Sequence, residues 1–407
     1  MFGWEFPPHN SGGLGTACEG LTTALTDSGV EIVFVLPKRL GETAGRVKKM
    51  LFANVDKMKV RRVPGLLYPY VTSQSYAELK MMLGAAAESY GNSLLEEVLY
   101  YGRRARAIAE TEDFDVIHAH DWLAYPAGLV AKRVSGKPLV VHVHATEYDR
   151  GGGNGINRQV YKIEREGMQQ ADGVIAVSQW TKNLIVKHYG IPAEKIRVVH
   201  NGVRTDDDSA LAHDRSAVGV GGLETLKAVG NKLILFVGRI TLQKGPDYFV
   251  RMAKRVLEFE PQTYFVMVGS GDMLGQVMNL AASLGIAGRF LFPGFLRGQE
   301  LNAIYQLADL YILPSVSEPF GITPLEALAN GTPVMVSKQS GVAEVLSHAL
   351  KVDFWDVEEM TNQILAVLRH DALRQTLADY GQQEIAHVTW AEAAHKCLNF
   401  YQQLAKI

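Results

Sequence analysis

Residues 233–245, "LILFVGRITLQKG", decide the fold of the second half of this 407-residue chain. Five apolar residues and a glycine come first, and Arg239, Lys244 and a second glycine follow. Such an apolar run is typical of a buried strand in a parallel sheet. The residues after it then lie at the carboxyl end of the strand, where doubly wound sheets bind ligands. Two cations there favour a diphosphate, although two ordinary surface cations would fit this stretch equally well.

Short apolar runs of the same kind recur along the whole chain. Longer segments with a helical period separate them, for example residues 94–109 and 303–309. Apolar strands that alternate with helices predict parallel sheets with helices on both faces. The other expected strands are residues 31–37, 115–120, 139–145, 173–178, 196–202, 263–269, 289–294, 310–315 and 332–337.

The strands fall into two series, because residues 204–231 contain no strong strand. This segment holds the acidic run "TDDDS", which we interpret as a solvated linker. A chain of this length also favours more than one domain. We therefore predict two doubly wound α/β domains, residues 1–204 with 386–407, and residues 205–385, with the site in the cleft between them. Residues 390–407 are an expected amphipathic helix, and its predicted apolar side holds Ala394, Leu398, Phe400 and Leu404.

The composition excludes several classes of protein. Hydrophobic residues make up 47% and charged residues 21% of the chain, which is typical of a soluble globular protein. The net charge of −2 gives no basic excess for a nucleic-acid partner. No apolar run reaches the roughly 18 residues of a membrane span, so no integral membrane segment is expected. Two distant cysteines make no disulfide framework, which fits a cytoplasmic protein.

A second motif is "SEPFGITPLEA", residues 317–327, which follows an expected strand. Pro319 and Gly321 predict a loop that holds Glu318, and Glu326 then falls in the first turns of the next helix. Two carboxylates and the amides at a helix start can bind sugar hydroxyls and an anion. An acidic turn that complements the helix dipole is the structural alternative.

Together, "VGRITLQKG" and "EPFGITPLEA" resemble the donor half of a retaining GT-B glycosyltransferase. The two glutamates with seven residues between them resemble the signature of glycosyltransferase family 4 and the glycogen synthases. The resemblance covers nearly the whole chain. It implies two Rossmann-like domains with an interdomain cleft, and a retaining, metal-independent hexosyltransferase of the EC 2.4.1 type.

The resemblance also implies roles for single residues. Arg239 and Lys244 would hold the donor diphosphate and take part in catalysis. Glu326 would bind the ribose hydroxyls, and Glu318 would lie beside the transferred sugar as a further catalytic residue. Backbone amides would line the sugar and the phosphates at Phe320, Gly321, Ile322 and Thr323.

Four histidines occur in pairs in the first half, at His118 and His120 in one expected strand and at His142 and His144 in the next. Four imidazoles could suggest zinc, but no cysteine lies near them in the sequence, so no metal is expected and buried, hydrogen-bonded histidines are favoured. The resemblance implies sugar contacts for His144, as a catalytic residue, and for Asp121, as a donor-binding residue. It implies none for the other three histidines.

The glycine-rich stretch "PPHNSGGLG", residues 7–15, fails as a dinucleotide fingerprint because its third glycine is missing. A plain turn is one alternative. With the motifs of the second half, Gly12 and Gly13 are instead expected to bring backbone amides to the donor diphosphate. Asn10 stands where bacterial ADP-glucose-type glycogen synthases carry a lysine, which puts a preference for ADP-glucose in doubt.

The expected reaction is transfer of a hexosyl group, with glucosyl favoured, to a carbohydrate acceptor, with an α-glucan favoured. The co-substrate is ADP- or UDP-glucose, and no cofactor is expected. Sucrose-type, lipid or other small acceptors are alternatives, as is a non-catalytic nucleotide-sugar binding protein. The surroundings of Lys338 do not match those of the lysine that carries pyridoxal phosphate in glycogen phosphorylases. The sequence predicts no oligomeric state.

Overall fold

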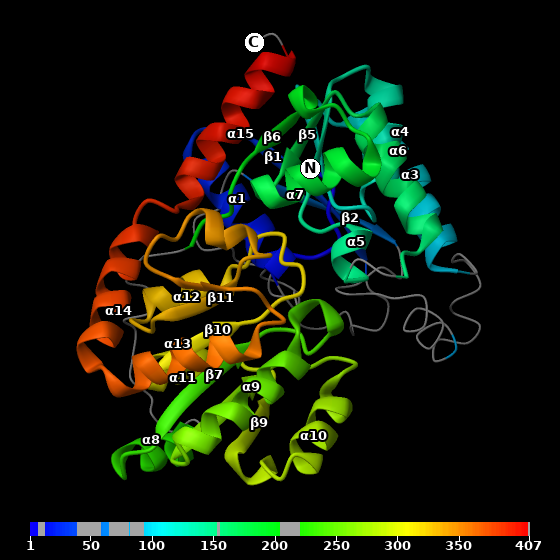
Figure 1. Cartoon of the computed structure of the whole chain (residues 1–407). Helices are drawn as coiled ribbons and strands as arrows, with labels where there is room; N and C mark the ends of the chain where they lie inside the picture. The colour runs from blue at the N-terminus through cyan, green and yellow to red at the C-terminus, as the bar shows by residue number, and fades with distance from the viewer. Residues whose placement is uncertain are drawn as a thin grey trace. The chain divides into compact units, whose positions relative to one another are not determined.

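The computed structural model describes residues 1–6, 13–38, 58–64, 81, 93–152, 155–203 and 220–405. The chain forms two compact α/β units, each with a parallel sheet, which confirms the expected fold class (Figure 1). Unit 1 comprises Met1–Glu147, Ile156–Gly202 and Trp390–Ile407. Unit 2 comprises Tyr148–Gly155 and Val203–Thr389.

The sheet of unit 2 has six parallel strands in the order β12-β11-β10-β7-β8-β9. Counted along the chain, this is the doubly wound order 3-2-1-4-5-6. Its topological switch point lies between β7 and β10, so the loops after these two strands meet at the carboxyl edge of the sheet. The strands are β7 (Lys232–Val237), β8 (Thr263–Val268), β9 (Phe290–Gly294), β10 (Leu310–Leu313), β11 (Val334–Ser337) and β12 (Leu350–Val352).

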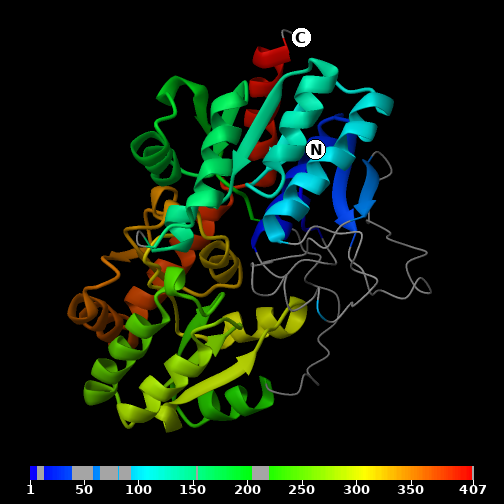
Figure 2. The same cartoon turned by 90° about the vertical axis from the view of Figure 1, so that its right-hand side faces the viewer.

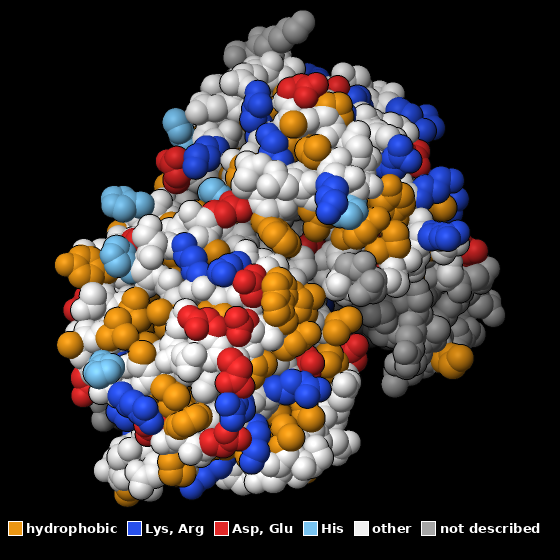
Figure 3. Space-filling view, viewed as in Figure 1, with side chains coloured by type: hydrophobic (Ala, Val, Ile, Leu, Met, Phe, Trp, Pro, Cys, Tyr) orange, Lys and Arg blue, Asp and Glu red, His pale blue; other side chains and the backbone are white. Residues whose placement is uncertain are grey.

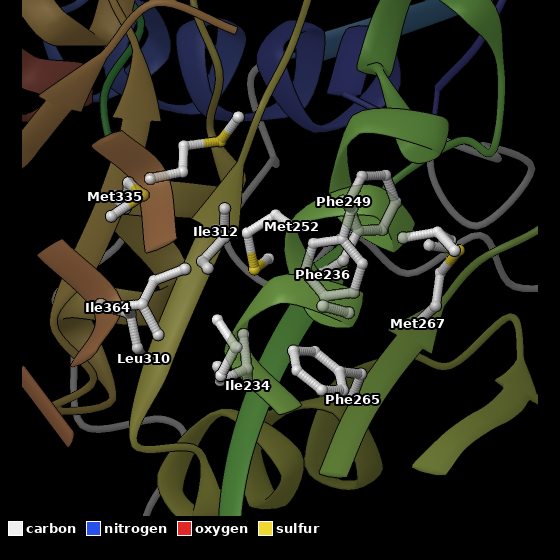
Figure 4. Packing of buried hydrophobic residues seen from close by; sticks show 14 of the residues in the cluster. Ile234, Phe236, Phe249, Met252, Phe265, Met267, Leu310, Ile312, Met335 and Ile364 are labelled. Atoms are coloured by element: carbon white, nitrogen blue, oxygen red, sulfur yellow. The ribbon is translucent and has the colours of Figure 1, made fainter. Parts of the chain in front are cut away.

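One face of this sheet packs against α9 (Pro246–Phe259), α10 (Leu274–Ser283) and α13 (Val357–Arg369), which supply a large buried cluster. Figure 4 shows Phe236 of β7 and Phe249 of α9 close together at its centre, and their ring centroids are 5.6 Å apart. Burial of this aromatic and aliphatic surface is the main stabilising term of the unit.

The opposite face of the same sheet packs against α8 (Val220–Ala228), α11 (Gly298–Leu307) and α12 (Thr323–Ala329). Tyr311 of β10 points to this side, because its ring lies 6.0 Å from that of Tyr305 on α11. The helix α14 (Asp371–Ile385) packs on α12 and α13. Both faces of the sheet are therefore covered, as its apolar strands predict.

Unit 1 holds the parallel strands β3 (Ile117–His120), β4 (Leu139–Val143), β5 (Gly173–Ala176) and β6 (Ile196–Val198) in that order. A second parallel pair is β1 (Ile32–Lys38) and β2 (Met58–Pro64). Phe2 joins the two groups through parallel bridges to Val35 of β1 and to Ala119 of β3. The loops that follow Phe2 and β3 therefore leave the sheet at its switch point.

Helices cover both faces of the unit 1 sheet. Figures 1 and 2 show α3 (Leu94–Thr111) and α4 (Tyr125–Ser135) side by side, and α6 (Arg158–Gln170) packs against α4. On the other face, α1 (Gly13–Asp27) packs against α15 (Trp390–Ala405). Gly20 allows this contact, because a Cβ there would lie 2.3 Å from the indole of Trp390. The short helix α7 (Gln179–Leu184) also belongs to this unit, and the short helix α5 (Glu147–Arg150) begins at the last residue of its first segment.

The structure differs from the predicted boundaries in three places, and the first is that the long segment of unit 2 begins at Val203 rather than after residue 204. Tyr148–Gly155 belongs to unit 2, although it was assigned to the first domain, and the Ser317 hydroxyl donates to Asp149 Oδ1 over 2.5 Å. Residues 386–389 also belong to unit 2, where the Val203 N–H donates to the Val388 carbonyl. The acidic run 205–209 lies outside the described residues.

The predicted apolar face of the last helix is partly wrong. Ala394 and Phe400 are buried, but Leu398 and Leu404 are only half-buried. Cys397 and Tyr401 take their place on the buried face. The predicted face therefore points in nearly the right direction, but Leu398 lies at its margin and Leu404 lies in the last turn of the helix.

Candidate functional site

In unit 2, the loops that follow β7 and β10 are held together by close backbone contacts. The first contains the 3-10 turn Leu242–Lys244 and then Gly245, whose φ is 62°. A Cβ on Gly245 would lie 2.1 Å from the Pro314 carbonyl oxygen, so only glycine fits this close approach. The Val316 N–H donates to the Gln243 carbonyl over 2.9 Å. The side chains on these two loops are therefore held at fixed positions.

Lys244 and Glu318, which the sequence analysis assigned to one donor site, form an ion pair. Their side chains are only 15% and 7% exposed. The Ser315 hydroxyl also donates to Glu318 Oε2 over 3.1 Å. Two charges with so little exposure are stable only as a pair, so each side chain holds the other in place.

The backbone of Glu318 is fixed as well. Its N–H donates to the Gln339 carbonyl and its carbonyl accepts from the Gly341 N–H, both over 2.9 Å. These bonds tie the loop after β10 to the loop after β11, and they leave the Glu318 side chain to Lys244 and Ser315. Glu318 is thus a rigidly placed carboxylate at the carboxyl edge of the sheet.

Arg239 lies in the first loop and is half-buried. Its Nη2 donates to Gln243 Oε1 over 3.1 Å, and Gln243 is itself buried. Gln243 therefore connects Arg239 to the segment that carries Lys244. A guanidinium and an ammonium on one short, glycine-bounded loop can bind a diphosphate from two directions.

The residues before and at the start of α12 form the second loop of the site. Gly321 has a φ of 99°, in the region that favours glycine. The Phe320 side chain is buried, and its carbonyl accepts from the Val342 N–H over 2.7 Å. The Thr323 hydroxyl is 2.7 Å from the Tyr311 hydroxyl. Ile322 directly precedes α12, and its carbonyl accepts from the N–H groups of Leu325 and Glu326 over 2.9 and 3.1 Å, which closes the first turn of this helix.

Glu326 lies in the first turn of α12, as predicted, and is half-buried. The Tyr305 hydroxyl donates to its Oε2 over 3.1 Å. Burial raises the pKa of Glu326, and the bond from Tyr305 opposes this rise. Tyr305 thus orients the carboxylate.

In unit 1, Asp121 directly follows β3 and has a φ of 58°, the one positive value among the described residues other than glycine. Its Oδ1 accepts from the His144 N–H over 2.7 Å and from the Ala145 N–H over 3.3 Å. Asp121 is buried. The carboxylate oxygen assigned to a sugar contact therefore holds the loop after β4. A strained backbone at such a position is typical of a functional site.

The four histidines form one stacked group, which we call the histidine quartet. His118 and His120 stack with centroids 4.3 Å apart, and His142 and His144 stack at 4.1 Å. His118 Nε2 is 3.2 Å from His142 Nδ1, and His120 Nδ1 is 3.0 Å from His144 Nε2. Tyr401 extends the first pair, with its hydroxyl 2.5 Å from His118 Nδ1.

Burial is the largest cause of the lowered pKa values across the quartet. The pKa lies well below the ordinary value for His118, His120 and His142, and the neighbouring imidazoles lower it further. Desolvation lowers the pKa of the half-buried His144 to about 3. The quartet is therefore neutral at physiological pH.

Cys18 of α1 lies beside the quartet in space, although no cysteine is near the histidines in the sequence. Its sulfur and ring nitrogens of His120 and His144 lie within 4.8 Å of one another. A second group with this spacing is His118, His120 and His142. The sequence gives no sign of this proximity, because the fold brings Cys18 to the sheet from a helix about 100 residues away along the chain.

The glycine-rich stretch is only partly described. Gly12 lies outside the described residues, as do residues 7–11. Gly13 is the exposed first residue of α1. The Gly15 N–H donates to Oε1 of the buried Glu5 over 2.6 Å, so one amide of this helix start already serves a carboxylate of the chain.

Several residues that support the site were not predicted from the sequence. Ser315 could have been found, because it is the last residue of an expected strand segment. Tyr305 and His120 contact residues 21 and 24 positions away, and Glu5 contacts Gly15 ten positions away. Gln243 lies inside the first motif, where its amide has no role that the motif reveals. The supporting residues are Ser315, Gln243, Tyr305, His120 and Glu5.

Two surface properties bear on the partners. On the face in Figure 3, Lys and Arg side chains are mixed with Asp and Glu side chains. Across the described residues, every helix is too short or too polar to cross a bilayer.

Two family models match the chain in succession. "Glycosyltransferase Family 4" matches residues 11–207, and "Glycosyl transferases group 1" matches residues 224–384. The two matches correspond to the two series of strands, and both describe sugar-transferring enzymes. The chain is thus a glycosyltransferase over most of its length.

Curated relatives agree with these matches. The chain is 29% identical to an uncharacterized glycosyltransferase of Methanocaldococcus jannaschii, over 98% of this chain and 97% of that protein. It is 31% identical to a D-inositol 3-phosphate glycosyltransferase of Mycolicibacterium smegmatis, over 73% and 69%. It is 27% identical to a glycogen synthase of Mycobacterium tuberculosis, over 85% and 79%.

Solved structures share the fold. A sucrose-phosphate synthase from Thermosynechococcus elongatus matches with a TM-score of 0.75 at 19% identity, over 97% of this chain and 95% of the other. Anabaena HepE in complex with UDP and glucose matches with a TM-score of 0.72 at 17% identity, over 99% of both chains. The chain therefore belongs to the GT-B glycosyltransferases of family 4 and is similar to the glycogen synthases.

Proposed function

We propose that the protein is a retaining, metal-independent hexosyltransferase that moves a glucosyl group from a nucleoside diphosphate sugar to a carbohydrate acceptor. The observation that carries this proposal is the paired Lys244 and Glu318 beside Arg239, on loops that follow β7 and β10. This is the switch point of the unit 2 sheet, where doubly wound sheets bind their ligands.

In this proposal, Arg239 and Lys244 bind the donor diphosphate. Negative charge grows on the leaving diphosphate as its bond to the sugar breaks, and fixed cations stabilise that charge without reorganisation. Gln243 orients Arg239, because its side-chain oxygen accepts from the guanidinium. Lys244 has three N–H donors and can therefore bridge Glu318 and a phosphate oxygen.

The remaining contacts orient the donor. Glu318 accepts hydrogen bonds from the sugar hydroxyls, and Glu326 accepts them from the ribose. Asp121 and His144 contribute from unit 1, with the His144 ring near the 6-hydroxyl. Backbone amides complete the donor site at Gly12, Gly13, Phe320, Gly321, Ile322 and Thr323.

The proposed chemistry is front-face attack through an oxocarbenium-like transition state. The bond between the anomeric carbon and the phosphate oxygen breaks, and the acceptor oxygen bonds to the same face of that carbon. The acceptor proton passes to the departing phosphate oxygen, so neither a protein nucleophile nor a cofactor is required. Glu318 is a poor nucleophile for a double-displacement route, because Lys244 and Ser315 already bind its carboxylate.

The relatives favour particular substrates. The presence of UDP and glucose in the HepE complex supports a UDP-glucose donor, and ADP-glucose is the alternative that the resemblance to glycogen synthases implies. The similarity to a glycogen synthase supports an α-glucan acceptor. The sucrose-phosphate synthase and inositol phosphate glycosyltransferase relatives support small acceptors as the alternative. A lipid acceptor and a non-catalytic nucleotide-sugar binding role are the further alternatives. The buried thiols of Cys18 and Cys397 support a cytoplasmic location.

A donor and acceptor panel tests the proposal. ADP-, UDP- and GDP-glucose are each incubated with maltooligosaccharides, fructose 6-phosphate, inositol phosphate and a lipid acceptor, and nucleotide release is followed with and without EDTA. We expect release from UDP- or ADP-glucose that depends on maltooligosaccharide and is insensitive to EDTA. Release with a small acceptor alone would favour the alternative acceptors. Binding without any release would contradict the enzymatic function.

A further inference from the structure

We propose that His120 is a positioning residue for the glycosyl transfer, because its ring fixes the orientation and the tautomer of His144. The inference rests on the proposed function, in which His144 contacts the donor sugar. His120 was given no role by the sequence analysis. It is fully buried at the end of β3, and its Nδ1 lies 3.0 Å from His144 Nε2.

The tautomer follows from the other nitrogen of His120. Nε2 of His120 is buried and has no hydrogen-bond partner among the described residues. A proton there would be a buried donor without an acceptor, which is costly. The proton is therefore on Nδ1, which donates to Nε2 of His144. Nε2 of His144 accepts this bond, so His144 carries its own proton on Nδ1.

This arrangement gives His144 a defined chemical function. It is a neutral imidazole whose Nδ1–H has no acceptor among the residues that the structure describes, and this donor suits a sugar hydroxyl oxygen. The ring cannot flip without losing the bond from His120. The stacked rings of His142 and Phe34 further restrict the pair, at 4.1 Å from His144 and 6.0 Å from His120 respectively.

The neighbouring residue holds the backbone of the same histidine. Asp121 accepts from the N–H groups of His144 and Ala145, and its left-handed conformation ends β3 at this point. The consecutive residues His120 and Asp121 thus both hold His144. His120 binds the His144 ring, and Asp121 binds the His144 main chain. Contacts that orient a metal-bound histidine typically change activity about 10- to 100-fold when they are removed, and we expect an effect of the same order here.

A bound metal is the competing explanation of the quartet, and the geometry disfavours it. The rings of His118 and His120 are inclined by only 16°, and those of His142 and His144 by 24°. Nearly parallel rings direct their lone pairs side by side, whereas zinc needs nitrogens that converge at about 2.0–2.1 Å. The two hydrogen-bonded pairs are His118 with His142 and His120 with His144. In each pair, one ring nitrogen of each histidine is directed at its partner and not at a common point.

The test is histidine ¹⁵N NMR on the full chain without donor, with the signals of His144 assigned from a His144→Ala variant. We expect the Nδ1–H tautomer of His144 in the wild type. In His120→Phe, which keeps a ring but has no nitrogen, we expect a shift toward the Nε2–H tautomer that dominates in water. An Nε2–H tautomer in the wild type, or an unchanged tautomer in folded His120→Phe, would overturn the inference.

Kinetics give a second readout. We expect kcat to fall about 10- to 100-fold in His120→Phe, with the KM for the nucleotide sugar nearly unchanged. His120→Asn keeps an amide near the position of Nδ1 and should recover most of this loss. His118→Phe is the matched control, since it is the same change in the same strand without a bond to His144. An equal loss in His118→Phe, or no recovery in His120→Asn, would indicate a structural role only.

Zinc binding separates the two explanations. When one equivalent of Zn²⁺ is added, we expect the His120 and His144 signals to stay unchanged and the zinc to pass through a desalting column. Stoichiometric retention with shifted Nε2 signals would overturn the inference, because the lone pair of His120 would then belong to the metal. The NMR outcome needs no turnover, so a failed transfer assay would contradict the proposed function and leave the tautomer result standing.

Discussion

Replacing Lys244 with methionine separates the structural contribution of this residue from its proposed catalytic one. Methionine keeps most of the aliphatic stem and removes the charge. Glu318 then remains as a carboxylate that is 7% exposed and that accepts from the Ser315 hydroxyl. The fold therefore loses the partner of a nearly buried charge, and this loss should appear as lower stability of unit 2.

The magnitude follows from the burial of the pair. Removing one member of a buried ion pair typically costs about 3–5 kcal/mol, because it leaves an uncompensated charge. Because the Lys244 side chain is still 15% exposed, we expect a loss of unfolding free energy near the lower end of this range, at about 3 kcal/mol. In a unit of this size, that corresponds to a fall in Tm of about 6–12 °C.

The double variant Lys244→Met with Glu318→Gln is the matched control. The neutral amide of glutamine can still accept from Ser315 and needs no cation. We expect the double variant to recover most of the 3 kcal/mol lost by the single variant, as measured by urea unfolding. Nucleotide release should nevertheless stay about 100-fold below the wild type in both, because the charge on the leaving diphosphate is unsupported.

Two results would refute this reasoning. If the double variant were no more stable than Lys244→Met alone, the ion pair would not account for the stability. If Lys244→Met kept the turnover of the wild type, the assignment of Lys244 to the diphosphate would be wrong.

Three further predictions concern the fold. When the pH falls from 7.5 to 5.5, the histidine quartet should lower the free energy of unfolding of unit 1 by about 5 kcal/mol. The reason is that histidines of the unfolded chain bind protons below about pH 6.5, whereas the folded ones have lowered pKa values and stay neutral. Urea unfolding at both pH values tests this, and His118→Phe should remove about a quarter of the effect. Gly245→Ala should destabilise unit 2 by at least about 2 kcal/mol more than Gly285→Ala, since both have positive φ but only the first meets a backbone oxygen; equal unfolding midpoints would contradict this. Cys18 and Cys397 should react with a thiol reagent only after unfolding, because burial raises the pKa of both and brings that of Cys397 to about 12; rapid labelling of native protein would argue against the described packing.

Much of the fold could be predicted from the sequence, because strands buried on both faces read as continuous apolar runs. Each of the ten expected runs contains a strand in the structure. In the part of the chain that the structure describes, two strands were not predicted, Met58–Pro64 and Leu350–Val352, and both lie at sheet edges. The first carries three charged residues and the second has only three residues in all, so neither has the apolar length that marks a central strand.

The candidate site was predicted less completely. Residues on one motif could be found together, as Glu318 and Glu326 were. Contacts between side chains of two different loops could not be predicted from the sequence, because they depend on the order of the strands in the sheet. The ion pair of Lys244 with Glu318 is an example. The bond between His120 and His144 was missed for a different reason, since period-2 alternation shows that two histidines share a face but gives no hydrogen-bond partner.

The configuration of the transfer product tests the proposed function most directly. UDP-glucose or ADP-glucose is incubated with a maltooligosaccharide in EDTA, and the anomeric signal of the added glucose is followed by ¹H NMR as it forms. Because these donors carry an α-linked glucose, retention predicts an initial α-linked product and an equal amount of released nucleoside diphosphate. A β-linked initial product, or activity that appears only with added metal, would contradict the proposed mechanism.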